Sequence, residues 1–214
     1  MNLSLATRLR REPRLYLVTI LALAVLLRLG VAFYLGDEVD APELLTDQRS
    51  YHALGARLIG GHGFSFAENW YPFTPAETPT SHWSFLYSLF AAGVYAVSGT
   101  YPLALRLFQA ILGGLLLPWM VYRLSRTMFS DHAAENGQMA EKISLVAALV
   151  AAIYPYFVLY AATLMTETLF IVVLLWTLER GLAMANWLRN RPDLPSLWLF
   201  GLALGVGLGL ATLL

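Results

Sequence analysis

Residues 44–64 read LLTDQRSYHALGARLIGGHGF, and they lie within the one long polar segment, Gly36 to Ser81, of an otherwise apolar chain. Asp47 opens this stretch, at a position where a carboxylate accepts hydrogen bonds from the free backbone N–H groups of a helix start. A glycine pair at 60 and 61 is a helix stop. A short one-sided helix between hydrophobic spans is typical of the membrane–water interface. The apolar positions recur at helical spacing and are Tyr51, Leu54, Leu58 and Ile59.

The composition indicates a membrane protein. Hydrophobic residues make up 58% of the 214 residues and charged residues 13%, whereas an average globular domain has about a quarter charged residues. The net charge is zero, so a basic nucleic-acid footprint is absent. The chain has no cysteine, which excludes disulfides and thiolate chemistry. The first apolar segment is too long for a signal-peptide core and lacks a cleavage site, so we expect a retained anchor.

Five apolar segments are long enough, or nearly long enough, to cross a hydrocarbon core that takes about 20 helical residues. Arg28 interrupts the first of them, and it either snorkels to the interface or faces a polar interior. Pro155 predicts a kink in the third. The chain stays apolar to residue 214, so we expect the remainder of the same transmembrane module to follow. The predicted spans are 15–35, 102–122, 143–163, 168–185 and 196–214.

Basic residues cluster in three places, at 8–14, 123–142 and 180–191, and the positive-inside rule puts all three in the cytoplasm. All three clusters can lie in the cytoplasm only if the apolar run from His82 to Ser98 does not cross the membrane. We therefore predict an all-α, polytopic membrane helix bundle with about five transmembrane helices. Its outer loop, 36–101, contains two juxtamembrane helices. The protein would be integral to the cell membrane with a cytoplasmic N-terminus and the loop outside (periplasmic, extracellular or, in a eukaryote, lumenal).

Acidic residues concentrate in the predicted outer loop, and one further acid, Glu167, begins a span at the same surface. An acid at a helix start is electrostatically favourable by itself, so Asp47 and Glu167 are either helix caps or functional groups. Two carboxylates brought to one face can share a divalent cation or divide base and metal-holding roles. Seven of the fourteen acids belong to the loop: Asp37, Glu38, Asp40, Glu43, Asp47, Glu68 and Glu77.

Three other residue types in this region are candidate ligand contacts. Arg106 lies one turn inside the outer end of its span, where a guanidinium either binds phosphate through two nitrogens or snorkels. Glu77 is a weaker third acid. The histidines at 52, 62 and 82 lack the close, patterned spacing of a zinc site.

The chain resembles a known family, the polyprenyl-phosphate-sugar-dependent membrane glycosyltransferases of the GT-C type. It is most similar to the protein O-mannosyltransferase and lipid A aminoarabinose transferase-like group, glycosyltransferase family 39. Nearly the whole chain takes part. The motifs that carry the resemblance are DQRSYHALG (47–55) with GGHG (60–63), the segment 79–99, LRLFQA (105–110), YRLSR (122–126), and the segment from Tyr154-Pro155 to Thr166-Glu167.

The resemblance implies transfer of a hexose or pentose from a polyprenyl-phosphate donor to a lipid, glycan or protein acceptor on the outer face. It assigns catalytic roles to Asp47 and Glu167, which are also the candidate ligands of a Mg²⁺ or Mn²⁺ ion. Arg106, Tyr51, His52 and Glu77 are the expected substrate contacts. No nucleotide cofactor is expected, and we expect this part of the chain alone to be inactive.

The alternative is a non-enzymatic polytopic membrane protein, namely a transporter, a lipid-linked glycan flippase or an assembly scaffold. Transporters carry ionisable groups at mid-membrane and inverted repeats. The sequence has no visible repeat, and its acids gather at the predicted outer surface. This distribution favours the enzyme over the transporter.

Overall fold

The computed structural model describes residues 13–39, 47–71, 73–190 and 197–214, with the side chains of 130–136, 190 and 197 left out. Arg8, Arg10 and Arg11 of the first basic cluster, Arg191 of the third, and the first residue of the predicted span 196–214 lie outside these residues.

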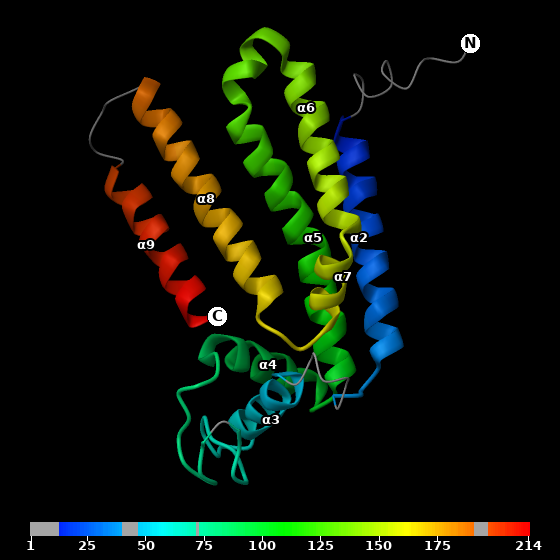
Figure 1. Ribbon diagram of the computed structural model, residues 1–214, viewed down its shortest axis with the longest axis vertical. Coiled ribbons are helices and arrows are strands. Elements are labelled where there is room, and N and C mark those ends of the chain that lie inside the picture. The colour runs from blue at the N-terminus through cyan, green and yellow to red at the C-terminus, as the bar shows by residue number, and fades with distance from the viewer. Residues whose placement is uncertain (1–12, 40–46, 72, 191–196) are drawn as a thin grey trace.

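Most of the described residues are helical, and the predicted all-α fold is confirmed (Figure 1). They contain no strand, only two isolated bridges that pair Ser65 with Pro79 and Trp70 with Thr74. The helices are α2 (Pro13–Leu35), α3 (Asp47–Ile59), α4 (Phe85–Ser98), α5 (Pro102–Met128), α6 (Ser130–Ile153), α7 (Pro155–Ala162), α8 (Glu167–Asn190) and α9 (Leu197–Leu213).

Helix α5 is the centre of the bundle and packs against α2, α6 and α8. Two adjacent glycines allow this close packing. A Cβ on Gly114 would lie 2.8 Å from the backbone of Val25 in α2, and a Cβ on Gly113 would lie 2.7 Å from the Thr168 methyl in α8. Small residues at such positions let helix backbones approach closely. A Gly-Gly pair in mid-helix therefore positions α2 and α8 on either side of α5.

Three of the described helices are long and apolar enough to cross a membrane: α2, α5 and α8. The predicted span 143–163 is a helix pair, α6 and α7, bent by 54° at the break before Pro155, and this pair makes a fourth candidate. The kink predicted at Pro155 is thus confirmed. Helix α9 has 17 residues and is shorter than a full span. The membrane helix bundle is confirmed, and the described residues contain three helices, or four with the bent pair, that are long and apolar enough to span a membrane.

Arg28 faces the interior of the bundle and is fully buried. The alternative that its side chain snorkels to the membrane interface is therefore wrong. Its guanidinium donates to the carbonyl oxygens of Ala24 (3.0 Å), Ala152 (2.9 Å) and Ala151 (3.3 Å). In an unbroken helix the carbonyl of Ala151 would accept from residue 155, but a proline has no N–H. Arg28 therefore satisfies the carbonyls that the break in α6 leaves free.

Helices α3 and α4 lie across one end of the bundle instead of along it (Figure 1). The helix predicted within 44–64 is confirmed, and it begins at Asp47. The Ser84 side chain caps α4 by accepting from the Tyr87 N–H at 3.1 Å. A Cβ on Gly55 would lie 3.0 Å from Ala91, so the two helices are in close contact. The apolar face of α3 is thus buried against α4.

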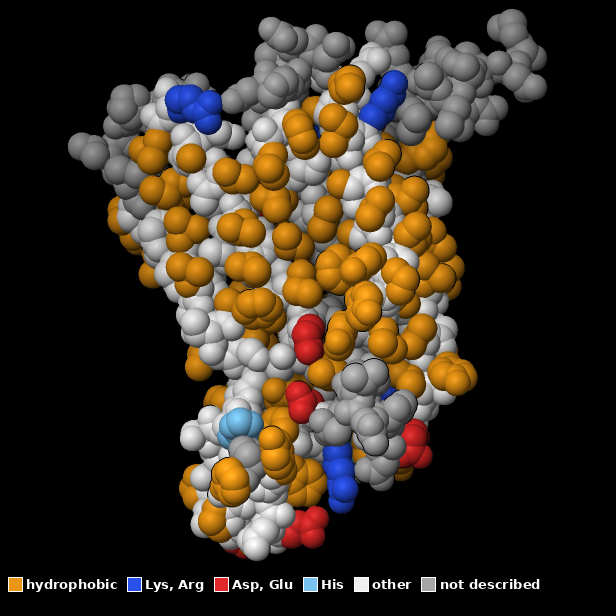
Figure 2. All heavy atoms as spheres, in the orientation of Figure 1, with side chains coloured by type: hydrophobic (Ala, Val, Ile, Leu, Met, Phe, Trp, Pro, Cys, Tyr) orange, Lys and Arg blue, Asp and Glu red, His pale blue; other side chains and the backbone are white. Residues whose placement is uncertain are grey.

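The two ends of the bundle carry different charges. Figure 2 shows hydrophobic side chains over the middle of the helices on this face, acidic side chains together with a basic one toward the lower end, and basic side chains at the upper end. The lower end holds α3, α4 and the starts of α5 and α8; the upper end holds the turn between α5 and α6 (Figure 1). Which end faces the cytoplasm stays a prediction.

Candidate functional site

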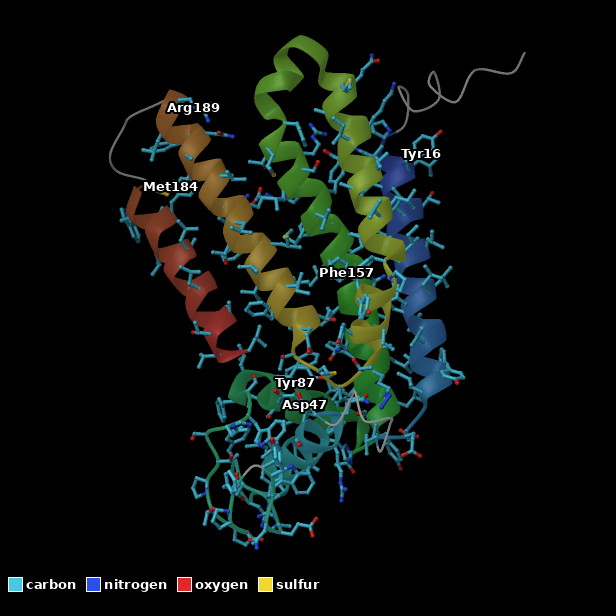
Figure 3. The ribbon with its side chains drawn as sticks, in the orientation of Figure 1. Tyr16, Asp47, Tyr87, Phe157, Met184 and Arg189 are labelled. Atoms are coloured by element: carbon cyan, nitrogen blue, oxygen red, sulfur yellow. The ribbon has the colours of Figure 1, made fainter. Side chains whose placement is uncertain are left out.

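The two predicted catalytic acids begin two different helices at the same end of the bundle. Asp47 is the first residue of α3 and Glu167 the first residue of α8. Figure 3 labels Asp47 and Tyr87 where α3 and α4 meet the bundle. Each carboxylate therefore lies where the positive end of a helix dipole favours a negative charge.

The phenol of Tyr51 connects the two acids. Burial raises the pKa of Tyr51 to about 12, and the negative charges of Asp47 and Glu167 both add to this shift. Hydrogen bonds with the Ser84 backbone and the Thr166 side chain oppose it. The phenol is thus protonated at neutral pH and lies within electrostatic reach of both carboxylates. Two acids 120 positions apart in the chain thus act electrostatically on the same phenol.

Glu167 retains unused hydrogen-bonding capacity. Its Oε2 atom is buried and has no hydrogen-bond partner among the described residues, and the same is true of the neighbouring Thr168 hydroxyl. A buried carboxylate oxygen without a partner is costly. This makes the start of α8 a place where a bound hydroxyl or cation would remove an energetic penalty.

Gln48, the residue after Asp47, ties three elements together. Its Oε1 atom accepts from Arg106 Nη2 of α5 at 3.0 Å and from the Leu164 N–H, in the turn before α8, at 3.2 Å. Arg106 Nη2 also donates to the Glu38 carbonyl at 2.6 Å. These contacts fix the start of α3 relative to the start of α8. The sequence motif contained Gln48, but its role was not predicted.

Arg106 does not lie at the surface of the site. Its side chain is fully buried, and Nε and Nη1 have no hydrogen-bond partner among the described residues. The alternative that Arg106 snorkels to the interface is therefore wrong. Its Nη2 atom instead donates to the Glu38 carbonyl and to Gln48 inside the protein.

A second buried polar contact fixes α4 on the bundle. The Tyr87 hydroxyl donates to Gln109 Oε1 at 2.6 Å, and Gln109 Nε2 donates to the carbonyls of Tyr160 (3.0 Å) and Thr163 (2.7 Å). Burial raises the pKa of Tyr87 well above its usual value. One glutamine thus joins α4, α5 and α7.

His52 and Glu77, expected to contact substrate, both have protein partners in the structure. His52 Nδ1 lies 2.9 Å from the Tyr95 hydroxyl. Burial lowers the pKa of His52, the positive charge of Arg106 lowers it further, and Asp37 opposes this. Glu77 pairs with Arg57, which also donates to Ser65 at 3.1 Å. Both residues therefore stabilise the outer segment.

A cavity of about 670 Å³ opens beside Asp47. Glu167 and Arg106 are not among the described residues that line it, so of the two predicted catalytic acids only Asp47 borders this cavity. The part that residues 68–71 take in this cavity was not predicted from the sequence. The described lining residues are Asp47, Arg49, Ser50, Glu68, Asn69, Trp70, Tyr71 and Trp83.

No group of three or more histidine, aspartate or glutamate side chains that could hold a metal ion is found in the described part of the chain. Asp47 and Glu167 therefore have no third protein carboxylate or imidazole beside them that could complete a metal site among those residues.

Comparison of the chain with protein-family models, with curated proteins and with solved structures finds no match.

Proposed function

We propose that the protein is a membrane glycosyltransferase of the GT-C type that moves a sugar from a polyprenyl-phosphate donor to an acceptor at the α3–α4 end of the bundle. The observation that carries the proposal is the placement of Asp47 and Glu167 as the first residues of α3 and α8, with the start of α3 joined to the turn before α8 by Gln48. Acidic groups at the end of an apolar bundle suit a substrate whose reacting head group is polar and whose tail is hydrophobic.

Asp47 is the general base of the proposed reaction. It takes the proton of the acceptor hydroxyl or amine while the acceptor atom forms a bond to the anomeric carbon of the sugar. The bond between that carbon and the phosphate oxygen breaks, and the electron pair leaves with the polyprenyl phosphate. The Tyr51 phenol, protonated at neutral pH, is the nearby donor to an oxygen of the reacting groups. Asp47 is supported in this role because it also borders the open cavity.

Arg106 acts through Gln48 in this proposal and not on the phosphate. Its contacts with Gln48 and the Glu38 carbonyl hold the start of α3 in place. Arg106 is therefore a positioning residue for Asp47. This revises the expectation that Arg106 binds the donor phosphate directly.

In this proposal the carboxylates of Asp47 and Glu167 hold a divalent cation. Mg²⁺ is usually held by one or two carboxylates together with substrate phosphate oxygens and water. Asp47 and Glu167 provide two such groups, and Glu167 Oε2 has no other partner among the described residues. A bound cation would neutralise charge on the phosphate leaving group.

The test is transfer of label from polyprenyl-phosphate sugars by membranes that contain the full-length protein. Asp47→Asn keeps the size and the helix-capping ability of the side chain but removes the base. We expect it to lower kcat by roughly 10²- to 10⁴-fold at unchanged protein level. Asp37→Asn is the matched control, because Asp37 accepts from the Leu103 N–H at the start of α5 and asparagine can do the same. Full activity of Asp47→Asn would refute the proposed role of Asp47.

One observation favours the alternative of a lipid-linked glycan flippase or transporter. The α6–α7 pair is a broken helix, and broken helices line the substrate sites of many transporters. A flippase would move labelled lipid across vesicle membranes without forming a new glycosidic bond. Product analysis of the same assay therefore separates the two functions.

A further inference from the structure

We propose that the cavity beside Asp47 binds a neutral or amino-bearing saccharide. That this saccharide is the acceptor rests on the proposed function; the binding itself does not. The cavity's volume, about 670 Å³, lies within the range of roughly 300–1,000 Å³ that small-molecule sites occupy.

The cavity is held in shape by contacts of its own loop. Trp70 Nε1 donates to Ser50 Oγ at 2.9 Å, which attaches the loop to α3. The Trp70 backbone exchanges two hydrogen bonds with Thr74, of 2.8 and 2.9 Å. Phe66, almost fully buried, stacks on the Trp70 ring at 4.6 Å. A ligand would therefore enter a site that is already formed.

The lining combines hydrogen-bond acceptors with aromatic rings. The carboxylates of Asp47 and Glu68 accept hydrogen bonds only, and saccharide hydroxyls and ammonium groups are donors. Trp83 Nε1 is a buried donor without a partner among the described residues. The Tyr71 ring is 78% exposed, and an exposed ring offers its face to the C–H side of a sugar or to an ammonium group.

Trp70 does not serve as such a face. Phe66 covers it by stacking, and the Arg49 guanidinium lies 5.2 Å from the ring centroid. Trp70 is a wall of the cavity, and Tyr71 and Trp83 are left to contact the ligand. Tyr71, the exposed one of these two rings, is therefore the aromatic residue whose removal should weaken binding.

The charge of the lining selects against an anion. Asp47 and Glu68 are acidic and Arg49 is basic, which leaves one net negative charge among the described lining residues. A phosphate would meet carboxylates at close range, where like charges are unfavourable. The donor phosphate is therefore assigned to the other side of Asp47, toward Tyr51 and Glu167, where the divalent cation of the proposed function would offset the charge of the carboxylates. Asp47 stands between the two substrates, as a base for the acceptor must.

The experiment measures binding to the purified chain in nanodiscs by saturation-transfer difference NMR and calorimetry, without any donor. The probes are methyl α-D-glucoside, methyl α-D-mannoside and glucosamine, with inorganic phosphate and glucose 1-phosphate as anionic probes. Nanodiscs that carry a neutral glucosyl lipid form a further arm. They distinguish a soluble saccharide from a lipid-held one.

We expect at least one saccharide to bind, and we expect Tyr71→Ala and Glu68→Gln each to raise its Kd roughly tenfold, or about 1.4 kcal/mol. Both side chains are exposed, so neither change removes core packing. Phe73→Ala is the matched control, because Phe73 is 97% exposed on the same loop but does not line the cavity. The Kd of the saccharide for Phe73→Ala should equal its Kd for the unmodified chain.

Binding of phosphate or glucose 1-phosphate in competition with the saccharide would overturn the proposal. So would the absence of saccharide binding up to roughly 50 mM, or equal effects of Tyr71→Ala and Phe73→Ala. Failure of the proposed function gives a different pattern. Saccharide would then bind and respond to Tyr71→Ala and Glu68→Gln, but no label would be transferred from the polyprenyl phosphate.

Discussion

The Oε1 atom of Gln48 lies 3.2 Å from the backbone nitrogen of Leu164, and this contact joins the first turn of α3 to the turn that precedes α8. The same oxygen accepts from Arg106 at 3.0 Å. Asp47 is next to Gln48 in the chain, and Glu167 follows Leu164 by three residues. The distance between the two acids is therefore controlled by a side chain that belongs to neither of them.

Gln48→Ala removes the acceptor of two buried donors. An unsatisfied buried polar group costs about 1–3 kcal/mol, so we expect a clear fall in the thermal unfolding midpoint of the protein in detergent. Gln138→Ala, an exposed change in α6, is the control and should leave the midpoint unchanged. Equal midpoints for the two variants would contradict the structural role of Gln48.

Arg28→Met tests the break in α6. The variant keeps an unbranched apolar chain but leaves the carbonyls of Ala151 and Ala152 without their donor. Hydrogen bonds to a charged group contribute about 1.5–3 kcal/mol, so the free energy of unfolding should fall by that order. Thermal unfolding in detergent measures it. Leu26→Met, an exposed change in the same helix, should have little effect.

His52 predicts a pH dependence of stability. Its pKa is lowered in the folded protein from the usual 6.5, so below about pH 6.5 the unfolded chain takes up a proton that the folded chain resists. Stability should therefore be lost as the pH falls through this range. His52→Asn should reduce the slope of the unfolding midpoint against pH, and His62→Asn, an exposed change in the same loop, should not. Parallel slopes for the unmodified chain and His52→Asn would refute the assignment.

The membrane orientation is tested by cysteine labelling, since the chain has no cysteine of its own. The positions are Phe73, in the segment between α3 and α4, and Gln138, in the first half of α6, and both side chains are exposed. Figure 1 shows these two segments at opposite ends of the bundle. We expect an impermeant thiol reagent applied from outside intact cells to label the first and not the second. Labelling of Gln138→Cys alone would reverse the orientation, and labelling of both would refute it.

The helices themselves could be predicted because their signals are local. Apolar runs of about 20 residues predicted α2, α5 and α8 to within a few residues at their starts, and Pro155 predicted the break between α6 and α7. The glycine pair after Ile59 marked the end of α3. The length of α5 was underestimated, since the predicted end at residue 122 ignored a helix that continues to Met128 through Arg123 and Arg126.

The sequence alone determined that this is an all-α membrane helix bundle whose acids gather in one polar loop, because hydrophobic length and charge are properties of single segments. Only the tertiary structure decided what the charged and amide side chains do. Arg28 and Arg106 are buried because partners distant in the chain, the carbonyls of Ala151, Ala152 and Glu38, offer them hydrogen bonds. Tyr51 lies within electrostatic reach of both acids because Gln48 joins the first turn of α3 to the turn before α8. Such contacts depend on how the helices cross, and no periodicity within one helix encodes that.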